Sequence, residues 1–320
     1  MPIEIAESLS QLEDFIINLS KFSVPESDYC MFSSLVRSSL IKNYEFLKLA
    51  YKEDSFENYF FVTSFLRGIV EDIIVLESIH SLSFEKREKL LRNMQLLEVN
   101  ERILKQWEFF QKYRPFQPVI DKAYDFEEVR MDVQTIWREN GWPKFDVKPK
   151  SIMPPVRGLA EKLAPGILDL LYEFIYRLSS GTVHFSPQTL LRMSWGNVDS
   201  RNNLSGTISV RHMQNYYKAF CQIYGLLLFS FYFEFFSEEI ASTPIEQAII
   251  IDIRKSILEE MRWPEMITFE EMNLPRPNAY HDQILTFGII HQAIIETMKT
   301  GFINNNYQKF IETFKASKTD

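Results

Sequence analysis

Residues 55–80 form the stretch that most constrains how this chain can fold. Their large apolar side chains fall at nearly every angle around a helix instead of forming one stripe. The side chains concerned are Phe60, Phe61, Phe65, Leu66, Ile69, Val70, Ile73, Ile74, Val75 and Leu76. A helix with this pattern is normally the central, buried helix of a bundle. Asp54 and Glu57 have the spacing of a capping box that would open it.

Helical spacing of apolar residues continues through most of the remaining chain. Glycine and proline are sparse, with 10 and 14 among 320 residues, and almost no segment alternates as a strand would. The polar stretch 195–205 is expected to be a loop. The predicted helices cover residues 6–20, 26–51, 55–80, 83–112, 126–138, 156 or 166 to 180, 211–236, 243–263 and 281–299, with a short helix after them. We therefore expect an all-α bundle, with residues 1–240 as one helical domain and residues 241–320 as an accessory C-terminal region that packs on it.

Charge and composition restrict the partners and the compartment. The formal net charge of -8 argues against general binding of nucleic acid, so an RNA contact would need a local basic patch. The most basic helical face carries Lys86, Arg87, Lys89 and Arg92, and it is either a solvated face or a phosphate contact. The N-terminus lacks the basic and apolar regions of a signal peptide. We expect a cytoplasmic protein.

Two other features agree with that compartment. Cys30 and Cys221 are far apart within apolar helical patterns, which is typical of buried thiols in a reducing environment. The most membrane-like run, residues 219–236, is interrupted by Gln222 and Glu234, so a buried helix is expected and no membrane partner.

The familiar cofactor motifs are missing from the sequence. It contains no phosphate-binding Gly-Lys-Ser/Thr loop, no G-x-G-x-x-G and no G-x-S-x-G. The five histidines never fall within four residues of one another, so the usual zinc spacings do not occur. We expect no metal and no cofactor.

One pair of residues remains as a candidate for chemistry. An apolar helix carries Arg177 into its last turns and is expected to break at Gly181, with His184 in a short loop before Pro187. Arginine binds phosphate, and histidine transfers protons near neutral pH. A similar spacing occurs at Arg276 and His281, but that pair lies in a proline-flanked loop ahead of a helix.

The Arg177-x6-His184 pattern at the end of a late helix resembles the Arg-x4-6-His motif of the HEPN superfamily. The resemblance covers residues 26–236 and implies a HEPN-like bundle with additional C-terminal helices. Many members are metal-independent endoribonucleases of toxin and antiphage defence systems. It also implies RNA as substrate, a homodimer, and a cognate antitoxin or sensor protein as a possible partner class.

The resemblance assigns roles to individual residues. His184 would be the general acid or base and Arg177 would hold the scissile phosphate. Glu71, four residues after Arg67, would orient one of the two arginines. The remaining supporting candidates are Tyr176, which would stack on a base, and Ser179 or Ser180, which would supply a hydroxyl.

Plainer interpretations stay open for the same residues. Arg67 and Glu71 have the spacing of an ordinary surface ion pair. His184 could cap the free carbonyl groups of its own helix. At the level of the whole chain, the alternative is a non-catalytic HEPN-like module for dimerisation or for binding a partner or nucleotide.

Overall fold

The computed structural model describes residues 3–21, 29–51, 58–120, 126–142, 152–162, 168–198, 204–259, 261–266 and 283–284. Within these ranges the chain is mostly helical, in agreement with the expected all-α class. The helices are α1 Ile3–Gln11, α2 Glu13–Leu19, α3 Met31–Tyr51, α4 Tyr59–His80, α5 Phe84–Tyr113, α6 Glu127–Glu139, α7 Val156–Ala160, η2 Leu168–Tyr176, α8 Arg177–Val183, α9 Pro187–Leu191, α10 Gln214–Phe235 and α11 Pro244–Glu259. The Asp54–Glu57 capping box and the Arg276/His281 pair lie outside the described residues. So does the helix expected at 281–299 except for Gln283 and Ile284, which form a strand and not a helix.

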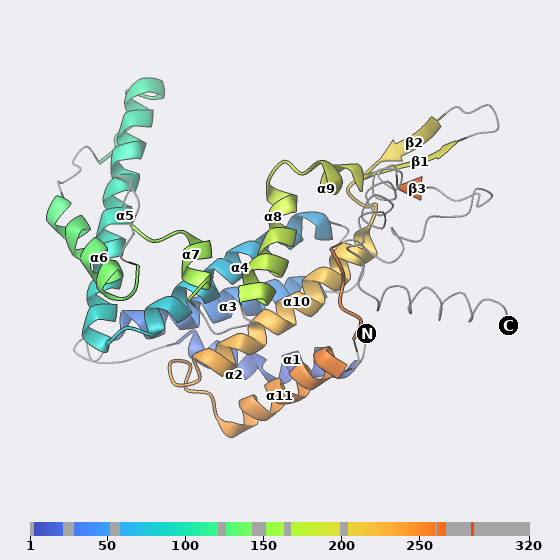
Figure 1. Ribbon diagram of the computed structural model, residues 1–320, viewed down its shortest axis with the longest axis horizontal. Coiled ribbons are helices and arrows are strands. Elements are labelled where there is room, and N and C mark those ends of the chain that lie inside the picture. Colours follow the sequence, from blue (N-terminus) through green and yellow to red (C-terminus); the bar gives the residue numbers. More distant parts are fainter. Residues whose placement is uncertain are drawn as a thin grey trace, which may run out of the picture.

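The core is built around α10, which packs against α3 and α4 (Figure 1). Every residue of α10 from Ile223 to Phe233 is buried. Gly225 allows the close approach of α3, because a Cβ there would lie 2.7 Å from a ring carbon of Phe46 and 2.9 Å from a methyl carbon of Leu47. No helix of the described ranges is long and apolar enough to cross a lipid bilayer.

The expectation that residues 55–80 are buried on all sides is wrong on one face. Twelve residues of α4 are buried, but Phe61 and Phe65 are 55% and 61% exposed. The apolar pattern correctly indicates a central helix that contacts α3, α8 and α10. How many of its sides are covered depends on the number of neighbouring helices, which the pattern does not contain.

The described residues of the expected loop at 195–205 belong instead to two antiparallel β-strands. Strand β1, Ser194–Val198, pairs antiparallel with β2, Leu204–Ile208, and β1 also pairs with the two-residue strand β3, Gln283–Ile284. The residues from 205 to 208 are all exposed. Because this part of β2 covers no core, it has no need of the alternating pattern that marks a half-buried strand.

The expected helix break at Gly181 is also wrong. The π-helix η2 passes directly into α8, which continues through Gly181 to Val183. A Cβ at Gly181 would lie 2.7 Å from Oγ1 of Thr189, so the glycine allows the start of α9 to approach. Glycine in a helix interior costs only about 1 kcal/mol relative to alanine, so close contact with α9 can outweigh its tendency to end the helix.

Two further regions complete the fold. Helices α5 and α6 pack on each other, and the distal part of α5 projects from the body (Figure 1). Helix α11 lies against α10 and α1. The sequence Thr243-Pro-Ile-Glu246 begins it with a capping box, in which the Thr243 backbone N–H donates to Glu246 at 2.8 Å and the Ile245 N–H donates to Thr243 Oγ1 at 3.3 Å.

Candidate functional site

Helix α8 packs against α4, and this contact assembles the polar side chains of the candidate site. Arg67 and Glu71 belong to α4, while Tyr176 ends η2 and His184 directly follows α8. We call these four residues the exposed cluster. They form two local pairs, Arg67 with Glu71 and Tyr176 with His184, and the two pairs lie at least 105 positions apart in the chain. Only the contact between the helices brings the two pairs together.

Arg67 is the centre of the exposed cluster. Its Nε donates to Glu71 at 3.3 Å, its Nη1 donates to His184 Nε2, and its guanidinium lies 4.9 Å from the ring centroid of Tyr176. The side chains of Arg67 and Glu71 are 24% and 35% exposed. The guanidinium is thus held by a carboxylate, an imidazole and an aromatic face while it stays accessible to a ligand.

The contact between Arg67 and His184 defines the state of the imidazole. An arginine N–H can only donate, so Nε2 of His184 is the unprotonated ring nitrogen in this arrangement. A neutral imidazole with an unprotonated nitrogen beside a cation is the form that can accept a proton from a substrate.

His184 does not cap its own helix with its side chain. Its backbone N–H donates to the Ser180 carbonyl at 2.9 Å, as in an ordinary last turn, while the imidazole turns to Arg67. The residue is exposed, and so are its neighbours Val183 and Phe185, at 51% and 84%. The imidazole therefore lies at the surface.

Tyr176 links the arginine to an aromatic pair. Its ring stacks on Tyr172 with centroids 4.7 Å apart and planes 16° from parallel. Burial raises the pKa of the Tyr176 hydroxyl, and the negative charge and hydrogen bond of Glu71 raise it further, with Arg67 opposing them. The hydroxyl therefore stays protonated at neutral pH and donates to Glu71.

Arg177 has a different partner from the one its spacing suggested. Its Nη2 lies 2.6 Å from Oε2 of Glu173, one turn earlier, and its side chain is 55% exposed. The structure thus brings Arg67, Glu71 and Tyr176 to His184, while Arg177 is engaged by Glu173. Glu173 and Tyr172 were not predicted, although both have the i,i+4 spacing to a predicted residue that often indicates a contact on a helix.

The two candidate serines belong to the interior of the helix. Ser179 is buried and donates to the carbonyls of Ile175 and Tyr176, at 2.8 and 3.1 Å. Ser180 Oγ is buried and has no hydrogen-bond partner in the described part of the chain. Ser179 is thus committed to the backbone, and the hydroxyl of Ser180 is closed to solvent, so neither serine offers a hydroxyl to a substrate in this arrangement.

The basic face of α5 is largely neutralised by acidic residues. Lys86 lies 3.0 Å from Glu139 and Lys89 lies 2.7 Å from Asp132, both on α6. Arg87 turns inward and its side chain is 13% exposed. Because these acidic residues of α6 offset the charge of both lysines, the face has less positive charge for a phosphate contact than the sequence suggests.

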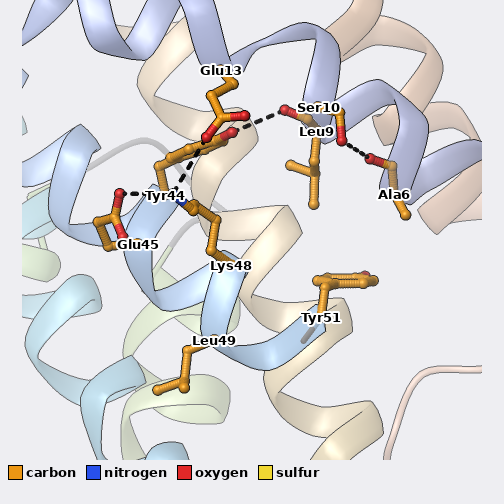
Figure 2. A pocket seen from close by; sticks show the side chains of 9 residues that line it. All are labelled: Ala6, Leu9, Ser10, Glu13, Tyr44, Glu45, Lys48, Leu49 and Tyr51. Carbon is orange, nitrogen blue, oxygen red and sulfur yellow. Dashed lines mark hydrogen bonds and ion pairs between the residues drawn. The ribbon is translucent and has the colours of Figure 1, made fainter. Parts of the chain in front are cut away.

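A separate groove between α1 and α3 is lined by none of the predicted site residues (Figure 2). It encloses about 630 Å³, and Lys48 at its wall lies 3.5 Å from both Glu13 and Glu45. Burial and these two carboxylates raise the pKa of Tyr44 to about 12. Because the lysine already faces two carboxylates, the groove offers no unbalanced cation for an anionic substrate.

Comparison with known proteins adds no assignment to this geometry. No protein-family model matches the chain, and no curated protein or solved structure matches it either. The class defined by fold and site is therefore a mostly helical protein with an Arg–Glu–Tyr–His cluster at its surface.

Proposed function

We propose that this protein is a metal-independent endoribonuclease with a HEPN-like bundle, acting in toxin or antiphage defence. The observation that carries the proposal is the contact between Nη1 of Arg67 and Nε2 of the exposed His184. The pair combines a phosphate-binding group with a proton acceptor at one accessible place. In the part of the chain that is described, no three His, Cys, Asp or Glu side chains are grouped to hold a metal ion.

The reaction that fits this pair is attack by a ribose 2′-hydroxyl on the adjacent phosphorus. His184 Nε2 accepts the proton of the hydroxyl, the 2′-oxygen bonds to phosphorus, and the bond to the 5′-oxygen breaks. The leaving 5′-oxygen takes a proton from water. The products are a 2′,3′-cyclic phosphate and a free 5′-hydroxyl.

Arg67 and Arg177 divide the phosphate binding in this proposal. The Nη1 group of Arg67 moves from His184 to the scissile phosphate and offsets the negative charge that develops on the phosphate oxygens. Glu71 continues to hold the Nε group of the same arginine. Arg177, more exposed and paired with Glu173, binds a neighbouring phosphate of the strand. The stacked Tyr172 and Tyr176 offer an aromatic surface for an unpaired base.

The proposal is tested by incubating the purified protein with single-stranded RNA in excess EDTA. We expect cleavage with cyclic-phosphate ends, reduced about 10²- to 10⁴-fold in His184→Ala, because a positioned acid or base contributes about that much. His212→Ala is the matched control, since that histidine is hydrogen-bonded through Nδ1 to the Met193 carbonyl and lies outside the cluster. Equal rates for wild type and His184→Ala would remove the proposal.

The second candidate function is a non-catalytic module that binds a partner such as an antitoxin or sensor protein, or a second copy of the chain. The observation that favours it is the apolar surface around His184, where Val183 and Phe185 are strongly exposed. Capture of a protein partner that is lost in Phe185→Glu, with no RNA cleavage by wild type, supports this candidate over the first.

A further inference from the structure

Helix α5 is thirty residues long, and its two halves have different surroundings. The proximal half buries Leu90, Leu91 and Leu97 against the body and α6. Beyond Leu97 no residue of α5 is buried. The distal half projects from the molecule (Figure 1).

The projecting half carries an apolar stripe that points away from the buried side. Leu97 is 3% exposed, but Leu96 and Val99 on either side are 43% and 48% exposed. Spacings of three or four residues continue the stripe through Ile103, Trp107 and Phe110, whose side chains are partly exposed. A solvated helix would carry polar residues on this face.

Aromatic side chains concentrate toward the tip of the same helix. Phe109 and Tyr113 are each 55% exposed, with ring centroids 4.9 Å apart, and Phe116 just beyond the helix is 98% exposed. Tryptophan and tyrosine are over-represented among the residues that contribute most to protein interfaces. An exposed apolar surface of this extent on a soluble domain usually marks a contact site.

Charge and area indicate what binds to this surface. We call residues 96–113, the distal half of α5, the arm. It carries three acidic residues (Glu98, Glu101, Glu108) and three basic residues (Arg102, Lys105, Lys112), so it has no net charge although the chain carries -8. Two of the pairs are closed within the helix, Glu98 with Arg102 at 2.9 Å and Glu101 with Lys105 at 2.8 Å. Two copies can therefore meet at the arm with less of the repulsion that their acidic bodies would impose.

From these observations we propose that the distal half of α5 pairs with the same helix of a second copy, side by side and antiparallel. A two-fold axis places the stripe of one copy against the same stripe of the other, and two-fold symmetry is the commonest arrangement of a homodimer. Five stripe residues and the neighbouring aromatic rings from each copy remove on the order of 1,000 Å² from water, because one aromatic side chain alone buries about 150–250 Å². Specific interfaces begin at about that size.

The arm is well separated from the end of α8 in Figure 1. Pairing through α5 therefore joins two copies without bringing their His184 residues into one site. It predicts a dimer whose RNA cleavage, where present, does not depend on the interface.

Light scattering coupled to size-exclusion chromatography tests the proposal on the full chain. Wild type is expected to be a dimer at tens of micromolar, and Trp107→Glu and Val99→Glu are expected to be monomers with unchanged helical circular dichroism. Phe65→Glu, at an exposed position of α4, is the matched control and stays dimeric. A monomeric wild type, or a dimer that both arm variants preserve, overturns the proposal, and binding of anionic vesicles by a monomeric wild type would assign the arm to membranes instead.

Single cysteines along the stripe test the direction of pairing. In an antiparallel pair only the middle of the stripe meets its own copy, so Ile103→Cys is expected to form an intermolecular disulfide under mild oxidation while Leu96→Cys and Tyr113→Cys are not. Wild type is the background control, since Cys221 is buried and Cys30 partly so. Cross-linking at all three positions, or at none of them, contradicts the antiparallel arrangement.

Discussion

Helix α4 carries two clusters of similar composition in very different surroundings. The exposed cluster near its middle holds Arg67, Glu71, Tyr176 and His184 at the surface. The buried cluster at its C-terminal end consists of Glu77, His80, Arg87 and Glu239. Each contains arginine, glutamate and histidine, so residue type alone does not distinguish them.

The burial of one ion pair and the unsatisfied polar atoms separate the two clusters. In the buried cluster the side chains of Glu239 and Arg87 are 8% and 13% exposed, while those of Glu77 and His80, at 30% and 32%, are about as accessible as Arg67 and Glu71. His80 lies 3.2 Å from Glu239 and 3.6 Å from Glu77, the latter an electrostatic contact rather than a close hydrogen bond. Glu77 Oε2, Arg87 Nε and Glu239 Oε2 are buried without a hydrogen-bond partner among the described residues. A cluster of this kind contributes to stability only as long as its charges balance.

The comparison teaches which cluster can do chemistry. The buried one joins α4 to α5 and to the turn after α10, and Arg87 and His80 lie against the Phe32 ring, at 4.3 Å and 5.5 Å from its centroid. The exposed one leaves the imidazole of His184 open to solvent and the side chain of Arg67 partly accessible. We therefore expect changes in the first to alter the free energy of unfolding and changes in the second to alter activity.

The largest effect on stability is expected from Arg87→Ala. Removing the arginine takes away the cation 3.8 Å from the buried Glu239 carboxylate, which costs about 3–5 kcal/mol for buried pairs. Urea unfolding measures the loss. Lys86→Ala, one residue earlier in an exposed pair with Glu139, is the control and should cost less than about 1 kcal/mol. A loss for Arg87→Ala no greater than that of the control means that the cluster is not stabilising.

A double substitution sharpens this result. Adding Glu239→Gln to Arg87→Ala removes the charge of the carboxylate that the first change leaves unpaired. The double variant should therefore lose less unfolding free energy than the sum of the losses in the two single variants. Simple additivity would show that the arginine acts through its contact with Phe32 instead of through charge.

A smaller, pH-dependent effect is expected from Glu77→Gln. Burial and the nearby Glu239 raise the pKa of Glu77 above its ordinary value of 4.5, although His80 opposes them. The folded state then retains a proton that the unfolded state has lost, so this contribution to stability is present below pH 4.5 and is lost as pH rises through the folded pKa. Unfolding free energies at about pH 5 and pH 7 should fall less with pH in Glu77→Gln than in wild type. If the unfolding free energy of Glu77→Gln changes with pH as much as that of wild type, Glu77 is not the group whose titration lowers stability.

The smallest effect on stability is expected from Arg67→Ala in the exposed cluster. Its ion pair with Glu71 contributes a few tenths of a kcal/mol at this spacing, so the unfolding free energy should change by less than about 1 kcal/mol. RNA cleavage should fall about 10²- to 10³-fold, as when a donor that stabilises developing charge is removed. Arg177→Ala is the informative comparison. A greater loss of cleavage in that variant than in Arg67→Ala would show that Arg177, and not Arg67, binds the scissile phosphate.

Several features of the fold were readable from local pattern. The periodic apolar stretches gave helices where α3, α4, α5, α6 and α10 lie, and the Thr243–Glu246 capping box marked the start of α11. These features depend on neighbours within a few residues, which is the range over which helical periodicity and capping act. The strands β1 and β2 were missed because backbone pairing holds them together, and residues 205–208 are exposed and need no alternating apolar pattern.

For the candidate site, the sequence alone determined the local pairs: Arg67 with Glu71 one helical turn apart, and His184 just after a helix that holds Tyr176 and Arg177. Only the tertiary structure decided that α8 crosses α4, so that Arg67 is the arginine beside His184 while Arg177 pairs with Glu173. The same holds for Gly181, which continues its helix because α9 approaches it. Spacing along one helix fixes which residues share a face, whereas the choice between two arginines depends on how two helices pack, and no local pattern contains that angle.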